Sequence, residues 1–173
     1  MENVNNNNSA SALSQIMASI ELGPTSSLQM MMAKLQLANA MICKSQAEDQ
    51  MKQIEKAQEE QKAVAQMISD ARKLQEQAEE SGNCTTMSNE MKEWMDKRGL
   101  AIHTAGSDQL HNKDEWAYNI QSLTDYQQSI SNDTQTMMVY LQDFIGQYNS
   151  YLQGANSAVQ QGNQTLQAIA TGR

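Results

Sequence analysis

Two histidines and three nearby acidic residues are the side chains in this sequence best suited to hold a metal ion. His103 and His111 lie eight residues apart, Asp108 lies between them, and Asp114 and Glu115 follow. A metal site needs such ligands in a fixed geometry, with outer partners that orient them. Two histidines at this spacing in a polar segment are more typical of solvated side chains. We therefore predict no metal site and no cofactor.

Nucleophilic and phosphate-binding motifs are absent from the sequence. Neither GxGxxG nor GxxxxGK[ST] occurs around Gly99 and Gly106, and no Ser or Cys has the strand-turn-helix context of a nucleophile elbow. The carboxylates of residues 48–80 alternate with Lys and Arg at helical spacing, which is typical of a solvated helix face. The sequence thus predicts a protein that is not an enzyme.

Cys43 and Cys84 are the two cysteines of the chain. If both lie on or near one long helix, their separation of 41 residues corresponds to about 60 Å. That distance excludes a disulfide within the chain. We predict two free thiols that pack as small hydrophobic residues.

The composition favours long helices with narrow apolar seams rather than a layered core. The 173 residues include one Pro, eight Gly and one Phe, and the aromatic residues all lie at or after Trp94. No β-branched stretch alternates with period two, so no sheet is expected. The net charge of −8 argues against nucleic acid as a partner. The most apolar stretch, 28–43, is broken by polar residues, so direct membrane insertion is not expected.

Residues 1–24 are predicted to form a disordered export tail followed by a short amphipathic helix. Residues 1–8 are polar and rich in Asn, and the N-terminus lacks the basic and apolar regions of a cleaved signal peptide. Ser9 is a candidate N-cap for the short helix, and Thr25 or Ser26 for the next one. The apolar residues of the short helix keep helical spacing: Leu13, Ile16, Met17 and Ile20.

Residues 25–80 are predicted to form one long helix of about 55 residues, because they lack Gly and Pro and are rich in strong helix formers. Its first half is apolar over a wide arc, and its second half narrows to a seam. The arc at 30–42 fits either a second partner surface or a core beneath the N-terminal helix, and both alternatives stay open. The predicted partner-facing residues are Met31, Leu35, Met41, Ile42, Ile54, Val64 and Ile68.

Residues 81–112 are predicted to form a small connecting head. A short helix over 87–98 would place Met87, Met91, Trp94 and Met95 on one face. Gly99 has the character of the residue that ends it. The remainder, 100–112, is expected to be loop, with at most a short strand at 100–103.

A heptad repeat over the second predicted long helix, 113–171, is the clearest pattern in the sequence. Asn112 and Glu115 have the form of a capping box at its start. From Trp116 onward, seam positions recur in alternating steps of four and three for more than five heptads. The predicted self-assembly seam consists of Ile120, Leu123, Ile130, Met137, Leu141, Phe144, Tyr148, Tyr151, Ala155 and Leu166. Two helices of matched length predict an all-α fold, a long antiparallel coiled-coil hairpin that forms a single structural domain.

The two predicted long helices differ sharply in charge. Residues 44–99 contain 21 charged side chains, whereas residues 117–172 contain three and no Lys or Arg. A helix that faces water normally carries charges on its outer side. The neutral helix therefore favours a homo-oligomer, although a Gln-rich monomer surface is the alternative. Candidate channel-facing polar residues are Gln142, Gln147, Asn149 and Gln153.

The order of these features resembles the EspA/SseB-like proteins of bacterial type III secretion systems, which extend the secretion needle as a hollow filament. The resemblance covers residues 25–173 in layout and is most specific at Met91–Ile102, which reads MKEWMDKRGLAI. Residues 148–157 are also similar to the C-terminal helix of needle-tip proteins. The head at 81–112 is shorter than the head of tip proteins, which favours a filament.

The resemblance implies a secreted filament subunit of a bacterial surface appendage that conducts translocated proteins to a host cell. It also implies export by an uncleaved N-terminal signal and polymerisation through the coiled coil into a helical filament. The implied partners are a cognate cytoplasmic chaperone before export, and needle and translocon proteins afterwards. The alternatives are a needle-tip protein that forms a small ring and a cytoplasmic secretion chaperone or adaptor that offers a helix-binding surface.

Overall fold

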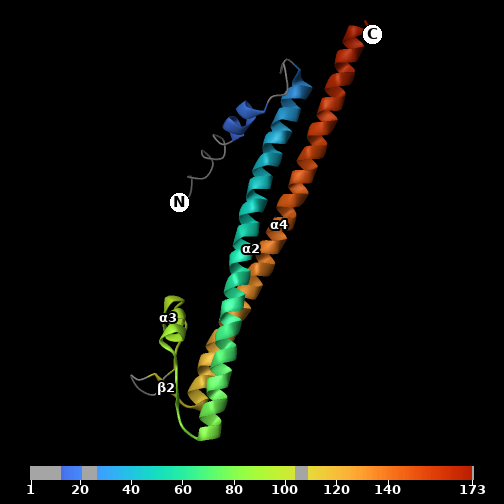
Figure 1. Ribbon diagram of the computed structural model, residues 1–173. Helices are drawn as coiled ribbons and strands as arrows, with labels where there is room; N and C mark the ends of the chain where they lie inside the picture. The colour runs from blue at the N-terminus through green and yellow to red at the C-terminus, as the bar shows by residue number, and fades with distance from the viewer. Residues whose placement is uncertain (1–12, 21–26, 104–108, 173) are drawn as a thin grey trace, which may run out of the picture. The chain divides into compact units, whose positions relative to one another are not determined.

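The computed structural model describes residues 13–20, 27–103 and 109–172. Its elements follow in the order α2 (Leu28–Ser81), β1 (Thr85–Thr86), α3 (Asn89–Lys97), β2 (Leu110–His111) and α4 (Lys113–Ala170), as Figure 1 shows. Residues 13–19 are also helical. The two long helices α2 and α4 pack against each other, which confirms the predicted all-α hairpin. The predicted disordered tail and the candidate caps Ser9, Thr25 and Ser26 lie outside the described residues.

Contacts group the chain into two compact units. Met1–Lys52 and Met138–Arg173 form one unit, here called the terminal unit. Gln53–Met137 form the other, here called the head unit. A segment of a long helix pair contacts mainly the segment opposite it, so each unit contains its own stretch of α2 and of α4.

The core of the head unit is made where α3 packs on α2 and α4. The methionine face predicted for the short helix is buried in it, with Met87, Met91 and Met95 almost fully enclosed. Trp116 and Leu123 of α4 are inaccessible to solvent. The other buried members of this core are Val64, Ile68, Ala71, Ala78 and Ile130.

Local capping contacts fix the ends of the helices. The capping box of α4 is confirmed: the Asn112 N–H donates to Glu115 Oε2 at 2.8 Å, and the Glu115 N–H donates to Asn112 Oδ1 at 2.9 Å. At the start of α2 the Met30 N–H donates to Ser27 Oγ at 3.2 Å, so Ser27 is the cap. Gly99, with φ of +65°, follows α3 as predicted, because this backbone conformation suits glycine.

The head unit contains a two-stranded antiparallel sheet, contrary to the prediction of no sheet. Thr85 pairs with His111, and Thr86 pairs with Leu110. The predicted strand position at 100–103 is irregular instead. The Trp116 indole N–H donates to Thr85 Oγ1 at 2.8 Å, and that hydroxyl donates to the Leu74 carbonyl at 2.8 Å. Two-residue strands are too short to show a period in sequence, so tertiary contacts decide this pairing.

In the terminal unit, α2 and α4 run antiparallel in a heptad register. The Cys43 thiol donates to Gln147 Oε1 at 3.7 Å. Seven residues earlier on α2, Gln36 packs against Gly154: its Cδ lies 3.1 Å from the position that a Cβ on this glycine would take. After another seven residues, the Cβ of Gln29 lies 3.5 Å from the corresponding position at Gly162. Steps of seven along α2 thus match steps of seven or eight in reverse along α4. The α2 row that faces α4 consists of Gln29, Ala33, Gln36, Ala40, Cys43, Ala47 and Gln50, all buried or half-buried.

Candidate functional site

The residues predicted as seam or partner face in the first half of α2 do not face α4 in this register. Met31, Leu35 and Met41 are 54%, 39% and 48% exposed, and Ile42 is half-buried. Alanine and glutamine face α4 here instead, because α4 presents large side chains such as Tyr148, which small residues on α2 accommodate. In the head unit the predicted residues Ile54, Val64 and Ile68 are buried.

The seam residues predicted on α4 differ in burial along the helix. Leu123, Ile130 and Ala155 are buried, whereas Leu166 is 53% exposed. Gly162 already lies beside Gln29, the second residue of α2, so α4 extends beyond the start of α2. Leu166 therefore continues the heptad where the described part of α2 has no residue to face it. The half-buried seam residues are Ile120, Met137, Leu141, Phe144, Tyr148 and Tyr151.

Exposed apolar side chains gather in the terminal unit. Among the described residues, every large hydrophobic side chain that is mostly exposed belongs to this unit, apart from Leu110 and Tyr118. The same unit is poor in charge, since residues 27–43 carry only Lys34 and residues 144–172 carry none. An apolar, uncharged surface of this extent is typical of a site of protein interaction. Its exposed residues are Leu28, Met31, Met32, Leu35, Met41, Met51, Met138, Val139, Tyr140, Ile145, Leu166 and Ile169.

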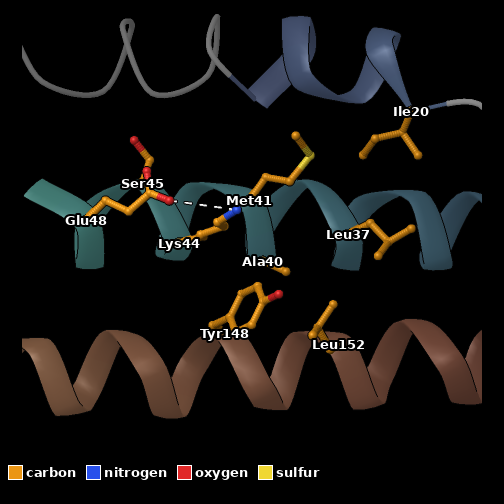
Figure 2. Close-up of a pocket in the computed structure, with 9 residues that line it drawn as sticks. All are labelled: Ile20, Leu37, Ala40, Met41, Lys44, Ser45, Glu48, Tyr148 and Leu152. Carbon is orange, nitrogen blue, oxygen red and sulfur yellow. Dashed lines mark ion pairs between the residues drawn. The ribbon is translucent and has the colours of Figure 1, made fainter.

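A groove with a volume of about 390 Å³ lies on one side of the terminal unit. Figure 2 shows Tyr148 and Leu152 pointing from α4 toward α2, with Ile20 pointing toward α2 from the N-terminal segment. Lys44 and Glu48 form an exposed ion pair at the edge of the groove, with Nζ and Oε1 3.7 Å apart. The lining residues are Ile20, Leu37, Ala40, Met41, Lys44, Ser45, Glu48, Tyr148 and Leu152.

Residues seven apart in each helix define the walls of this groove, and of these wall residues Leu37, Lys44 and Leu152 line the pocket itself. Such residues lie on one helix face, and the pocket already joins Leu37 and Lys44 of α2 to Leu152 of α4. Farther along α4, in the head unit, the same heptad position holds Ser131 and Thr124, so this row is apolar only in the terminal unit. This contrast was visible in the sequence but was not used to predict a site. The wall residues are Met30, Leu37, Lys44 and Met51 on α2, and Val159, Leu152, Ile145 and Met138 on α4.

A second apolar stripe of α2 lies beside the row that faces α4. We call it the α2 ridge: Leu28, Met31, Leu35 and Ile42, at steps of three, four and seven. The first three side chains are exposed, Ile42 is half-buried, and Ala38, which lies between Leu35 and Ile42 on the same face, is fully buried. The wide apolar arc of the sequence is thus resolved into a groove wall on one face of α2 and a ridge on another.

The polar residues predicted to face a channel are not equivalent. Gln142, Asn149 and Gln153 are exposed on α4. Gln147 is also exposed, but its side chain accepts a hydrogen bond from Cys43 and is therefore directed toward α2. Burial raises the pKa of the Cys43 thiol above its usual value.

The two cysteines have different environments, although both were predicted to pack as small hydrophobic residues. Both are free thiols. Cys43 is buried in the α2–α4 interface as predicted, whereas Cys84 is exposed in the segment before β1. The prediction for Cys84 is corrected because it lies in the turn that follows α2, outside the helix packing.

The histidines of the head unit are not both solvated, as the sequence had suggested. His111 is only 1% exposed, and its Nδ1 lies 2.9 Å from the His103 carbonyl oxygen. The His103 N–H donates to Asn119 Oδ1 at 2.7 Å. His111 is therefore a packed residue of the core, next to Trp116. Within the described residues, which omit Asp108, no group of three or more His, Cys, Asp and Glu side chains could hold a metal ion.

A charged cluster joins α3 to both long helices within the head unit. Both Glu60 carboxylate oxygens accept hydrogen bonds from the Arg98 guanidinium, and Oε1 also accepts one from the Tyr126 hydroxyl at 3.0 Å. The guanidinium lies 3.9 Å from the centre of the Trp94 ring. These contacts outweigh desolvation and hold the pKa of the Glu60 carboxyl below its usual value, the hydrogen bond from Arg98 contributing most. The cluster anchors α3 and offers no free acid or base.

Replacing Gly146 by alanine is expected to stabilise the terminal unit by about 0.8–1 kcal/mol, because glycine disfavours a helix interior. A Cβ at Gly146 meets no atom within 4 Å. The matched control is Gly154→Ala, whose Cβ would lie 3.1 Å from Gln36 Cδ and must displace that side chain. Thermal unfolding of dilute protein should show a smaller gain for Gly154→Ala. Equal gains would contradict the register proposed from the Gln36 contact.

Comparisons with protein-family models, with curated proteins and with solved structures found no match to this chain. In the part of the chain that the structure describes, no helix is both long and apolar enough to cross a membrane.

Proposed function

We propose that this chain is a secreted structural subunit that self-assembles into a hollow filament, which extends a type III secretion needle and conducts translocated proteins to a host cell. The carrying observation is that exposed apolar side chains and a low density of charge coincide in the terminal unit. Met91–Ile102 and the order of the elements resemble EspA/SseB-like proteins. This resemblance is the reason for proposing a filament of a type III secretion system.

The terminal unit has the surface of a protein that is incomplete as a monomer. Met31, Met51, Met138 and Ile145 each leave about half of their surface in water. Burial of apolar surface contributes about 25 cal/mol per Å², and charged side chains are few in this unit, so little charge must be desolvated. Association of several copies through this unit is therefore favourable.

The head unit has the opposite character. Its core is enclosed, and its surface carries most of the charged residues of the chain. Ion pairs such as Lys73–Asp70 and Lys97–Glu93 lie on exposed helix faces. A unit of this kind suits the outer, water-facing part of a filament, while the terminal unit supplies the contacts between copies.

The proposed partners follow from the same division of roles. Before export, a cytoplasmic chaperone would cover the apolar surface of the terminal unit and prevent premature polymerisation. After export, needle and translocon proteins would contact the two ends of the filament. The exposed polar residues Gln142, Asn149 and Gln153 are proposed to line the channel, because neutral side chains do not retain charged cargo.

Fractionation of the producing culture followed by negative-stain microscopy tests this function. We expect the chain in the culture supernatant, and open-ended filaments in the purified protein above a critical concentration. A closed ring of a few copies would indicate a needle-tip protein instead. A stable cytoplasmic heterodimer with no homopolymer would indicate a chaperone or adaptor. A monomer at all concentrations in sedimentation velocity would contradict self-assembly.

A further inference from the structure

We infer that the groove of the terminal unit receives the α2 ridge of a second copy of the chain. This inference rests on the proposed self-assembly and specifies its joint. The groove is the space between the α2 wall that includes Leu37 and the α4 wall that includes Leu152, and the ridge is Leu28, Met31, Leu35 and Ile42.

The two surfaces are compatible in length and spacing. The groove walls extend over residues 30–51, which is about 30 Å of helix at 1.5 Å per residue. The exposed part of the ridge, residues 28–35, is about 10 Å long, so it fits within the groove. Both walls and the ridge repeat at heptad intervals, which is the condition for side chains of a third helix to pack between those of a helix pair.

The charge of these surfaces favours a second copy as the occupant. The chain has a net charge of −8, which opposes contact between most parts of two copies. Residues 28–42 contain no acidic side chain, and Lys34 is their single charge. The charges at the edge of the groove, Lys44 and Glu48, neutralise each other. The ridge and the groove can therefore meet without repulsion.

Residues 13–20 of the same chain leave much of the groove wall uncovered. Ile20 contributes to its lining, together with Leu37 and Met41. With residues 13–20 in place, Met51, Met138 and Ile145 are still 50%, 48% and 45% exposed. A longer helix is needed to cover these wall residues, and α2 of another copy has that length.

The position of the two surfaces makes the contact heterologous. The ridge and the groove lie on different faces of the same unit, so each copy donates its ridge to one neighbour and accepts a ridge from another. Contacts of this type continue without closing unless their rotation forms a ring. The joint thus accounts for an open-ended assembly. In this assembly the head unit does not need to contact neighbouring copies.

A complementation experiment tests the joint with two variants. The groove variant is Met138→Glu with Ile145→Glu, and the ridge variant is Met31→Glu with Leu35→Glu. These side chains are exposed in the single chain, so helix content by circular dichroism should be unchanged. Each variant should raise the critical concentration for filaments roughly 100-fold or more, because each buries unpaired charge in the joint. An equimolar mixture should give a heterodimer, since one intact groove meets one intact ridge and growth stops there.

Wild type and Tyr118→Glu serve as controls, because Tyr118 is an exposed aromatic residue of the head unit. Both should form filaments at the same critical concentration. Normal filaments from either double variant would refute the joint but not the proposed function. Normal filaments are also expected if the N-terminal helix of the same chain closes the groove. A monomeric wild type would instead refute self-assembly itself.

Discussion

Replacing Trp116 by alanine is expected to lower the free energy of unfolding of the head unit by about 3–5 kcal/mol. The Trp116 side chain is completely buried, packs beside His111 and donates its indole N–H to Thr85. Truncation removes this apolar volume and also the hydrogen bond that ties β1 to α4. Since small domains are stable by about 5–15 kcal/mol, the loss is a large fraction of the total.

Urea unfolding followed by circular dichroism measures this loss, at a low protein concentration. Trp116→Phe keeps most of the volume and removes only the donor, so it should cost about 1–2 kcal/mol. In that variant Trp94 is the remaining tryptophan, and its fluorescence reports whether α3 stays docked. Tyr118→Ala, which removes only the exposed stacking of Tyr118 on the His103 ring, should cost much less than Trp116→Ala. A small effect of Trp116→Ala would show that the head core is assembled differently.

Replacing Glu60 by glutamine is expected to destabilise the docking of α3 by about 1–2 kcal/mol, because hydrogen bonds to a charged group are stronger than those to a neutral amide. The Glu60 and Arg98 side chains are only 26% and 25% exposed, so water compensates incompletely for the lost charge. Hydrogen exchange of the α3 amides should accelerate. Asp70→Asn, which disrupts the exposed pair with Lys73, is the matched control and should leave stability nearly unchanged.

The contribution of Glu60 should also depend on pH in a defined direction. Hydrogen bonding to Arg98, opposed by burial and assisted by Tyr126, lowers the pKa of Glu60 from its usual value of 4.5. The folded state therefore holds this proton less tightly than the unfolded state. The stabilisation is complete above pH 4.5 and disappears as the pH falls through the folded pKa. The difference between wild type and Glu60→Gln should shrink in that acidic range, and a constant difference would contradict a charge-based contribution.

Residue patterns were sufficient wherever the determining contacts are local. The capping box of Asn112 and Glu115 spans one helical turn, and Gly99 ends α3 through its own backbone conformation. The seam of α2 in the head unit, with Val64 and Ile68, was also predicted, because there the apolar residues are the ones that face α4.

Patterns misled where a polar or small residue occupies a position that an apolar residue could fill. In the terminal unit, Gln36 and Ala40 face α4 while Met31 and Leu35 remain outside. Hydropathy marks every apolar stripe of a helix but does not indicate which stripe meets the partner. The side chains of α4 decide this, because alanine lies where α4 presents a large residue such as Tyr148, and glutamine packs where α4 presents Gly154.

The amino-acid sequence alone is thus sufficient for the helices, their ends and the heptad along α4, because these depend on interactions within a few turns of helix. The tertiary structure alone decides the β1–β2 pairing, the burial of His111, the Glu60–Arg98 contact and the division of α2 into seam, groove wall and ridge. Each of these features joins residues far apart in the chain, and its free energy depends on which side chains the fold brings together.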